Sequence, residues 1–452
     1  MRTYKRLLFT VIAAVTLIAV RVQWFRSEQS LSSPGSSLSP IASPTTMAAE
    51  TPADRAIRAA ETAVGAQPQQ SAGYVALATA YMQKARESGD AGYYGRAEAA
   101  VQRALSLQPD AVEALRTLAW VQTGKHEFRE ALATAEQLRG RLPNDPLVYG
   151  LLSDAAIELG EYERAEEAVQ TMLDLHPGVA SYSRAAYLRE LYGDLAGATA
   201  LMEQAVKASS PRDPEPFAWC LVQLGHLYFN QGRVGKAETA YNNALAVFPY
   251  YYQALAALGR VRSVQQRYAE AIALYQQAVG IVPAPDLAAA LGDLLWRVGQ
   301  YDEAEKQYAL VEYIEHVHEI NQVAYNRQLA LFYADHNRNL DEAVALAETE
   351  ARRRHDVYSF DTLAWVYYKK GRFADAQQAM TQALRLGTQD AELLFHAGMI
   401  AKELGQAGQA KDYLQRALEL NPDFSLRDGE TARQTLAELE HPTMAQGEGY
   451  VR

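Results

Sequence analysis

Residues 221–249 read LVQLGHLYFNQGRVGKAETAYNNALAVFP, and this stretch decides the fold. Its first part carries large and small apolar residues three and four positions apart, which is the spacing of one face of an α-helix. These residues are Leu221, Leu224, Gly225 and Tyr228. A turn that contains Gly232 follows them. The first part therefore predicts one helix and the point at which it ends.

The second part of the stretch predicts a partner helix. It carries a small residue, a large one and another small one before a proline: Ala237, Tyr241, Ala244 and Pro249. Small residues let two helices approach closely, and the large one fills the gap to the next unit. Proline ends the helix because it lacks an N–H and crowds the preceding turn. The stretch therefore predicts a helix–turn–helix unit.

The same unit recurs along the chain. The alanines that open the second helices are Ala97, Ala131, Ala165, Ala198, Ala237, Ala271, Ala304, Ala343, Ala376 and Ala410, with spacings of 34, 34, 33, 39, 34, 33, 39, 33 and 34 residues. Prolines follow them mostly 34 residues apart, at Pro109, Pro143, Pro177, Pro211, Pro249 and Pro283. Two residue types that share one period indicate a repeat array rather than several globular domains.

This pattern resembles the tetratricopeptide repeat over about residues 71–424. The resemblance implies an all-α fold, a right-handed superhelical solenoid of about ten helix–turn–helix repeats with a concave, ligand-binding groove. We expect residues 52–70 to form an N-terminal helix that starts the stack, and residues 425–452 to form a C-terminal capping helix and a tail, because terminal units must cover an open apolar face.

Two places break the period by five residues each. The first excess lies at Ser209–Pro216, which reads SSPRDPEP. The second lies within Gln300–Lys370, which contains neither glycine nor proline, so we expect a lengthened helix pair around residues 312–335. Each insertion is either harmless or a specialised docking segment.

The N-terminus forms a separate unit. Residues 1–26 combine basic residues with the uncharged run Leu7–Val20, which predicts a signal anchor or, alternatively, a cleaved signal peptide. Residues 27–51 are rich in serine and proline and predict a disordered linker. The positive-inside rule then places the solenoid on the extracytoplasmic side of a membrane, with secretion after cleavage as the alternative.

Charge limits the partners of the body. The first 26 residues hold five basic residues and no acid, which leaves 38 basic against 54 acidic residues and a net charge of −16. Counterion release on a polyanion needs a basic surface, so we expect no binding of nucleic acid. For the same reason, we expect contact with a membrane through the N-terminal helix only.

The sequence gives no sign of catalysis. It contains no P-loop, no HExxH, no GxSxG and no CxxC motif. The glycines Gly89, Gly92 and Gly95 follow no strand, and Cys220, the single cysteine, is expected to be a buried thiol. The acidic and histidine-containing stretch Glu312–Glu319 is a poor metal site, because His316 and His318 diverge by about 200° on a helix. We therefore expect no enzyme activity, no cofactor and no metal.

The tryptophans indicate a binding face. Trp120, Trp219, Trp296 and Trp365 lie one or two residues off the packing stripes, a rotation of about 100–160°. The resemblance implies that this face of the first helix lines the concave groove. The same offset adds Tyr187, His226, Phe229, Asn230, Arg260, Asp293, Arg297, Asp361, Tyr368 and Phe395. Alternatively, some of these rings pack against neighbouring helices.

An aromatic groove with scattered polar groups suits a peptide. The clamp by which some family members grip acidic chaperone tails needs Lys and Asn at positions that here hold Val222, His226, Ala256 and Arg260, which argues against such a tail as ligand. We expect a non-enzymatic scaffold that binds a protein or peptide partner in its groove at the membrane. The alternative is a ligand-binding accessory factor, for example for glycans, of an envelope assembly or transport system.

Overall fold

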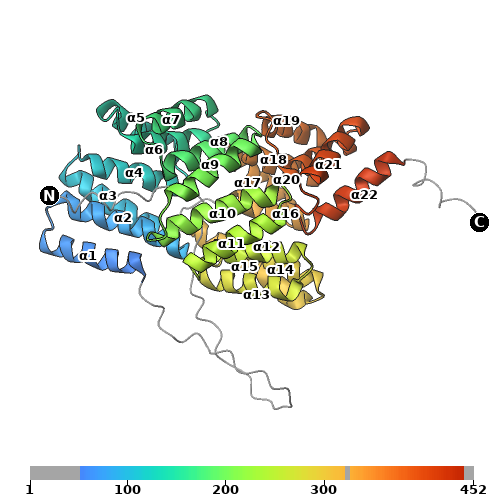
Figure 1. Ribbon diagram of the computed structural model, residues 1–452, viewed down its shortest axis with the longest axis horizontal. Helices are drawn as coiled ribbons and strands as arrows, with labels where there is room; N and C mark the ends of the chain where they lie inside the picture. The colour runs from blue at the N-terminus through green and yellow to red at the C-terminus, as the bar shows by residue number, and fades with distance from the viewer. Residues whose placement is uncertain (1–50, 321–325, 442–452) are drawn as a thin grey trace, which may run out of the picture.

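The computed structural model describes residues 51–320 and 326–441, which form 22 α-helices and no strand (Figure 1). The helices are α1 (Pro52–Ala66), α2 (Ser71–Ser88), α3 (Gly92–Leu107), α4 (Val112–Gly124), α5 (Phe128–Arg141), α6 (Pro146–Glu158), α7 (Tyr162–Leu175), α8 (Val179–Leu191), α9 (Leu195–Ala208), α10 (Pro214–Asn230), α11 (Val234–Val247), α12 (Tyr252–Val264), α13 (Tyr268–Ile281), α14 (Pro285–Arg297), α15 (Tyr301–Ile320), α16 (Asn326–His336), α17 (Leu340–Arg353), α18 (Val357–Lys369), α19 (Phe373–Ala383), α20 (Ala391–Glu403), α21 (Ala407–Leu420) and α22 (Asp428–Glu440). This confirms the all-α class.

Helices α2 to α21 form ten pairs, each an even-numbered helix packed on the odd-numbered helix that follows it. We number these pairs as repeats 1 to 10 and refer to the first and second helix of each repeat. Helix α1 packs on α2 at one end, and α22 packs on α21 at the other. The observed array matches the 34-residue period, which predicted about ten repeats.

Close contact between the two helices of a repeat explains the alternation of small and large residues. A Cβ atom added at Gly225 on α10 would lie 2.3 Å from the ring of Tyr241 on α11, and one added at Gly292 on α14 would lie 2.4 Å from Tyr308 on α15. Real side chains do not approach so closely, so only glycine admits the tyrosine that stands 16 residues further on. The repeating pattern in the sequence therefore records this packing.

The solenoid closes on itself (Figure 1). In three successive repeats, the connection after a second helix donates a hydrogen bond to a backbone carbonyl at the end of a first helix five repeats earlier. The three bonds run from His355 N to Glu158 O (3.0 Å), from Thr388 Oγ1 to Leu191 O (2.5 Å) and from Asn421 Nδ2 to Phe229 O (2.9 Å). We call these three contacts the seam.

The seam keeps a constant register. Its partners are 197 residues apart at Thr388 and 192 apart at Asn421. The second separation is five residues shorter because the insertion at Ser209–Pro216 precedes Phe229. A repeat protein usually contacts only its nearest neighbours along the chain, and here repeats 3 to 5 also contact repeats 8 to 10.

Both insertions hold repeat 1 against later repeats. Arg86 at the end of α2 pairs with Glu215 at the start of α10, with 2.5 Å between Nη2 and Oε1. Of the lengthened pair that we expected, α15 has 20 residues, whereas α16 has only 11. Ile314 of α15 is buried in one cluster with Met82 and Tyr94 of repeat 1. The docking partner of both insertions is thus this chain itself.

The predicted anchor, residues 1–26, and the predicted linker up to residue 50 lie outside the described residues. Within residues 51–320 and 326–441, no helix combines the length and the apolar character that crossing a membrane requires.

Candidate interaction site on the inner face

The first helices of the repeats face a central cavity of about 310 Å³. Its walls come from α6, α8, α10, α12, α16, α18 and α20 and from the connections that follow α17 and α21. The lining residues are Glu158, Tyr187, Asn230, Arg260, Arg327, Arg354, Tyr358, Asp390, Ala391, Glu392, Asn421 and Phe424. We call the surface formed by the first helices the inner face.

One wall of the cavity is a buried ion network centred on Arg354. Its guanidinium pairs with Glu158 across the seam, with Glu350 at 3.3 Å and with Asp356 at 3.4 Å, and Arg327 lies 3.8 Å from Asp356. Burial alone would lower the pKa of Arg354, but the three carboxylates outweigh it and raise that pKa. The network therefore adds ion pairs to the seam contact between His355 and Glu158, at the edge of the cavity.

Carboxylates gather beside the cavity: Asp390 and Glu392 line it, and Glu190 on α8 lies near Asp390. Burial raises the pKa of Glu190 and of Glu392 to about 7, and the charge of Asp390 adds to the rise, whereas the charge of His396 partly offsets it at Glu392. The pKa of Asp390 is itself raised by burial. The side chain of Asn230 hydrogen-bonds to Glu190. Among the residues that the structure describes, no basic side chain forms an ion pair with any of these three acids.

Two tyrosines line the cavity, Tyr187 and Tyr358. Tyr187 is 38% exposed, yet burial raises its pKa well above the ordinary value, and the nearby charges of Glu158 and Asp356 add to this. Both observations hold together because the ring faces an enclosed space inside the molecule. Burial likewise raises the pKa of Tyr358 well above the ordinary value. The cavity thus offers aromatic rings and hydroxyl groups beside separated positive and negative side chains.

Three predicted groove residues line this cavity: Tyr187, Asn230 and Arg260. Arg260 lies 4.3 Å from the ring centre of Phe229, which is the distance of a cation–π contact. These three predicted positions therefore lie on the inner face. Whether they bind a partner stays a prediction.

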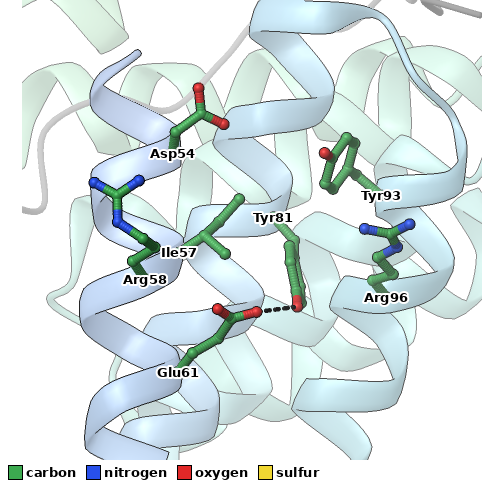
Figure 2. Close-up of a pocket in the computed structure, with 7 residues that line it drawn as sticks. All are labelled: Asp54, Ile57, Arg58, Glu61, Tyr81, Tyr93 and Arg96. Atoms are coloured by element: carbon green, nitrogen blue, oxygen red, sulfur yellow. Dashed lines mark hydrogen bonds between the residues drawn. The ribbon is translucent and has the colours of Figure 1, made fainter. Parts of the chain in front are cut away.

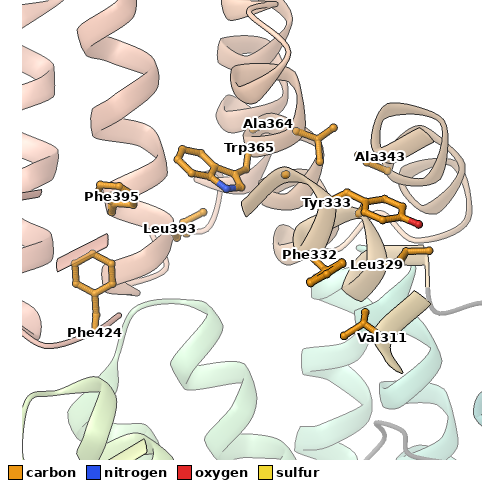
Figure 3. Packing of buried hydrophobic residues seen from close by; sticks show 14 of the residues in the cluster. Val311, Leu329, Phe332, Tyr333, Ala343, Ala364, Trp365, Leu393, Phe395 and Phe424 are labelled. Carbon is orange, nitrogen blue, oxygen red and sulfur yellow. The ribbon is translucent and has the colours of Figure 1, made fainter. Parts of the chain in front are cut away.

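Four predicted groove rings are buried rather than open to a groove, which corrects the expected exposure. They are Trp219, Phe229, Trp365 and Phe395. Trp365 stacks on His396 at 4.1 Å between ring centres, and its Nε1 donates to Asp335. Figure 3 shows Trp365, Phe395 and Phe424 in this part of the core. The offset from the stripe was right, but other parts of the chain cover the inner face here.

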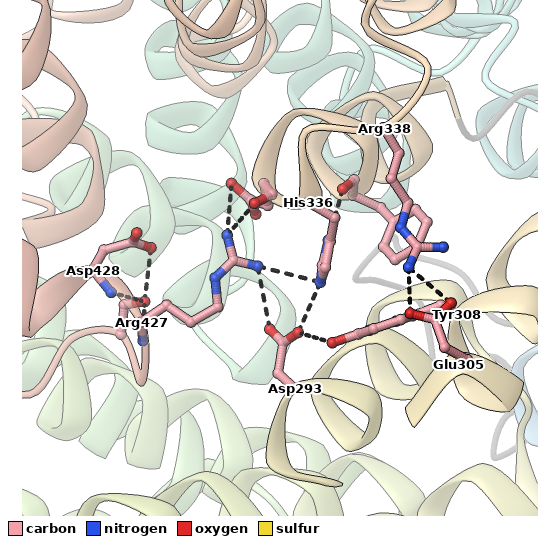
Figure 4. Close-up of polar contacts among 10 residues, drawn as sticks. Asp293, Glu305, Tyr308, His336, Arg338, Arg427 and Asp428 are labelled. Carbon is pink, nitrogen blue, oxygen red and sulfur yellow. Dashed lines mark hydrogen bonds and ion pairs between the residues drawn. The ribbon is translucent and has the colours of Figure 1, made fainter. Parts of the chain in front are cut away.

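Three predicted polar residues are engaged within the chain. Asp361 accepts from His396 at 2.9 Å; burial would lower the pKa of His396, but Asp361 outweighs it and raises that pKa to about 9. His226 lies 3.0 Å from the hydroxyl of Tyr241, and burial lowers its pKa to about 4. Asp293 accepts from Tyr308 at 2.8 Å and contacts His336 at 2.8 Å (Figure 4).

The remaining predicted residues are spread over the molecule. Trp296 is 50% exposed and contacts Tyr301 edge to face, and Arg297 beside it is exposed. Trp120 is half-buried between the clusters of repeats 1 to 3, and Tyr368 stacks on Trp365. These four residues do not line the central cavity, so the predicted set is not one continuous site.

No pattern in the sequence points to the ion network. Arg354 ends the basic run Arg352–Arg354 at a helix end, and Glu158 and Asp356 belong to ordinary helix ends. They meet only because repeats 3 and 8 meet. A local signal exists for Asp356 alone: its side chain caps α18 by accepting from the backbone N–H groups of Tyr358 and Ser359.

Two other predicted features can be placed. Cys220 is fully buried, and burial raises its thiol pKa to about 11, which agrees with an unreactive structural thiol. Gly89 ends α2 in the left-handed conformation, with φ 62°, which a glycine adopts without strain. Within the described part of the chain, no group of His, Cys, Asp and Glu side chains has the arrangement of a metal site.

A second pocket, of about 350 Å³, lies between α1, α2 and α3 (Figure 2). Tyr81 donates to Glu61 across it at 3.5 Å, and Arg96 lies over the ring of Tyr93 at 5.0 Å. Its polar groups therefore already have partners within the chain.

Comparison with known families agrees with the repeat period. Sequence models of the tetratricopeptide repeat match residues 90–154, 125–189, 222–286, 358–386 and 391–424. The chain is a tetratricopeptide-repeat protein. The matched segments lie in both the N-terminal and the C-terminal parts of the array, so the family assignment does not depend on one unit.

Two curated relatives are only partly covered by this chain. Human protein O-mannosyl-transferase TMTC1 is 27% identical over 236 residues, which are 49% of this chain and 24% of that protein. The TPR repeat-containing protein YpiA of Bacillus subtilis (strain 168) is 23% identical over 312 residues, 66% of this chain and 61% of that protein. The chain thus spans about a quarter and three fifths of their lengths.

Solved structures with similar folds include yeast Tom70 and the type IV pilus biogenesis factor PilW. Tom70 is 14% identical, with 87% of this chain and 93% of that chain covered and a TM-score of 0.38. PilW is 18% identical, with 45% and 93% covered and a TM-score of 0.39. These similarities add nothing to the choice of a partner.

Proposed function

We propose that this chain is a non-catalytic scaffold that binds a protein or peptide partner on its inner face, and that its N-terminal segment holds it on the extracytoplasmic side of a membrane. The central cavity carries the first half of the proposal. Seven first helices place Tyr187, Asn230, Arg260 and other polar side chains around one space, and tetratricopeptide-repeat proteins typically act through protein contacts.

The absence of catalytic motifs from the sequence supports a scaffold rather than an enzyme. The cavity lining contains no serine, threonine, cysteine or lysine, so it lacks the usual side-chain nucleophiles of covalent catalysis. The likeness to a mannosyl-transferase covers a quarter of that protein and supports no transferase activity here.

Site-specific photo-cross-linking tests the partner. A photoreactive residue replaces Tyr187 in the cavity or, as the control, Tyr250, which is 77% exposed on the connection before α12. We expect a discrete cross-linked protein or peptide from position 187 and not from 250. Equal products at both positions, or none at 187, would rule out the inner face as the binding surface. Binding of envelope glycans by the purified chain, without a protein product, would favour the accessory-factor alternative.

Membrane topology is tested with the same chain. Because Cys220 is fully buried, a cysteine introduced by Tyr250→Cys is the accessible thiol among the described residues. We expect a membrane-impermeant maleimide to label Y250C in intact cells, and the labelled chain to sediment with membranes. Labelling only after lysis would contradict the extracytoplasmic location, and labelled chain in the medium would indicate secretion.

A further inference from the structure

The connection between α21 and α22 crosses the inner face instead of the outer surface. It reads NPDFSLR from Asn421 to Arg427, and we call it the inner segment. Its residues Asn421 and Phe424 form part of the cavity wall. A connection between helices would ordinarily run over the surface, where water satisfies its backbone. This one obtains its partners from the inner face.

Every third residue of the inner segment contacts the first helix of a repeat. Each of these contacts falls one repeat later in the chain than the contact before it. Asn421 donates to Phe229 O at the end of α10, in repeat 5. The backbone carbonyl of Phe424 accepts from Arg260 of α12, in repeat 6, at 2.6 Å. The guanidinium of Arg427 lies 3.5 Å from the carboxylate of Asp293 of α14, in repeat 7 (Figure 4). A bound peptide would follow the same course across first helices.

Two side chains anchor the segment. The ring of Phe424 is 3% exposed and packs 5.6 Å from that of Phe395 (Figure 3). Arg427 donates to Asp335 O at 2.6 Å and contacts His336 at 3.3 Å, in addition to its pairing with Asp293. An aromatic ring in an apolar pocket and an arginine among carboxylates are the typical anchors of a peptide ligand.

Four residues that the sequence predicted as partner-binding are the ones that hold the inner segment: Phe229, Arg260, Asp293 and Phe395. Their side chains or carbonyls therefore have the chemistry of a ligand site, and the chain fills that site itself. Because the segment is tethered, its effective concentration is in the millimolar range or above, so it competes strongly with an external ligand.

We propose that the inner segment is a built-in pseudo-ligand, and that the partner is a peptide with an aromatic residue followed three positions later by an arginine, which displaces it from the inner face. This inference rests on the proposed function and specifies the partner class. A basic anchor also complements the body of the chain, which carries a net charge of −16 beyond residue 26.

The probe is a fluorescein-labelled synthetic peptide of residues 419–429, ELNPDFSLRDG. Fluorescence anisotropy measures its binding to the whole chain and to the Phe424→Ala/Arg427→Ala variant, whose inner segment lacks both anchors. We expect the variant to bind the peptide at least ten-fold more tightly than the unsubstituted chain does. A peptide with alanine at both anchor positions should not bind, and Gln434→Ala on the exposed face of α22 should behave as the unsubstituted chain.

A folded variant that binds the peptide no more tightly than the unsubstituted chain would overturn the proposal, as would equal binding of the alanine peptide. Should the variant fail to fold, hydrogen exchange on the unsubstituted chain decides. Excess peptide should speed the exchange of the amides of Asp423 and Arg427, which donate to Asn421 Oδ1 and Ser425 Oγ in the docked segment, and unchanged exchange would overturn the proposal. A cross-linked partner at position 187 together with a negative peptide result would remove the pseudo-ligand and leave the scaffold function standing.

Discussion

Two parts of the same inner face satisfy their polar groups in opposite ways. Around the inner segment, Asp293 receives bonds from Tyr308, His336 and Arg427, so its charge is neutralised within the chain. Beside the central cavity, Glu190 and Glu392 stand near Asp390, and burial raises the pKa of each to about 7, which the charge of His396 offsets only in part at Glu392.

This difference shows what each part contributes. A buried charge that is paired and hydrogen-bonded adds to the uniqueness of the fold, whereas crowded carboxylates cost stability and persist where another role maintains them. We therefore infer that the bonds around the inner segment stabilise its docked position, as in an occupied ligand site, and that the cavity is kept for a ligand. Four variants test this contrast.

The largest effect is expected from Trp365→Ala in the filled region. The side chain is 3% exposed and stacks on His396 and Tyr368, so its loss leaves a cavity and removes the hydrogen bond to Asp335. We expect the free energy of unfolding to fall by about 3–5 kcal/mol in urea titrations. Trp296→Ala, at a ring that is 50% exposed, is the matched control and should cost less than about 1 kcal/mol. Equal losses would contradict the contrast in burial.

A smaller loss is expected from Asp293→Asn. Burial alone would raise the pKa of Asp293, but the bonds from His336 and the charge of Arg427 lower it, so the carboxylate stabilises the folded state above its ordinary pKa. The side chains are partly exposed, so we expect a loss of roughly 1–2 kcal/mol at pH 7 that shrinks below about pH 4. Urea titrations at both pH values measure it, with the exposed Asp302→Asn as the control. A pH-independent loss would refute the electrostatic account.

An effect of opposite sign is expected in the cavity. The pKa values of Glu190 and Glu392 are higher in the folded state than the ordinary 4.5, so the folded protein binds more protons between about pH 4.5 and pH 7. Stability therefore falls as the pH rises through that window. The double variant Glu190→Gln/Glu392→Gln should remove most of this slope and, after allowance for cavity water, gain on the order of 1 kcal/mol at pH 8. Urea midpoints at pH 5 and pH 8 test it; a loss of stability at pH 8 would show that the acids are structural.

The smallest effect is expected from Tyr187→Phe. The hydroxyl faces the cavity, so its removal should change the free energy of unfolding by less than about 0.5 kcal/mol. Partner capture by the chain should nevertheless fall if the hydroxyl contacts the ligand. Loss of stability without loss of capture would reverse the roles that we assign to the two regions.

The sequence was sufficient to predict the helix pairs of the repeats. It was insufficient to predict the contacts between repeats 3 to 5 and repeats 8 to 10. The ladder from Ala97 to Ala410 recorded contacts within and between adjacent repeats, because those contacts recur at a fixed spacing. The offset from the packing stripe likewise found Tyr187, Asn230 and Arg260 on the inner face. Repetition makes such contacts visible in one sequence.

The seam and the inner segment are each made once, so no periodicity reveals them. Thr388 and Leu191 are 197 residues apart, and nothing in either neighbourhood marks the other. Similarly, Phe424 falls at the end of the predicted repeat array, and Arg427 falls in the predicted capping segment. The burial of Trp219, Phe229, Trp365 and Phe395 follows from this closure, which explains why the expected open groove is partly filled.

The seam has a consequence for evolution. An open solenoid can gain or lose a repeat at the cost of one interface, since its two ends never meet. Here, removal of one unit between Phe229 and His355 would shift all three rungs of the seam by a full repeat and separate Arg354 from Glu158. The seam thus fixes the number of repeats between its partners, so the spacing within the array has become part of its fold.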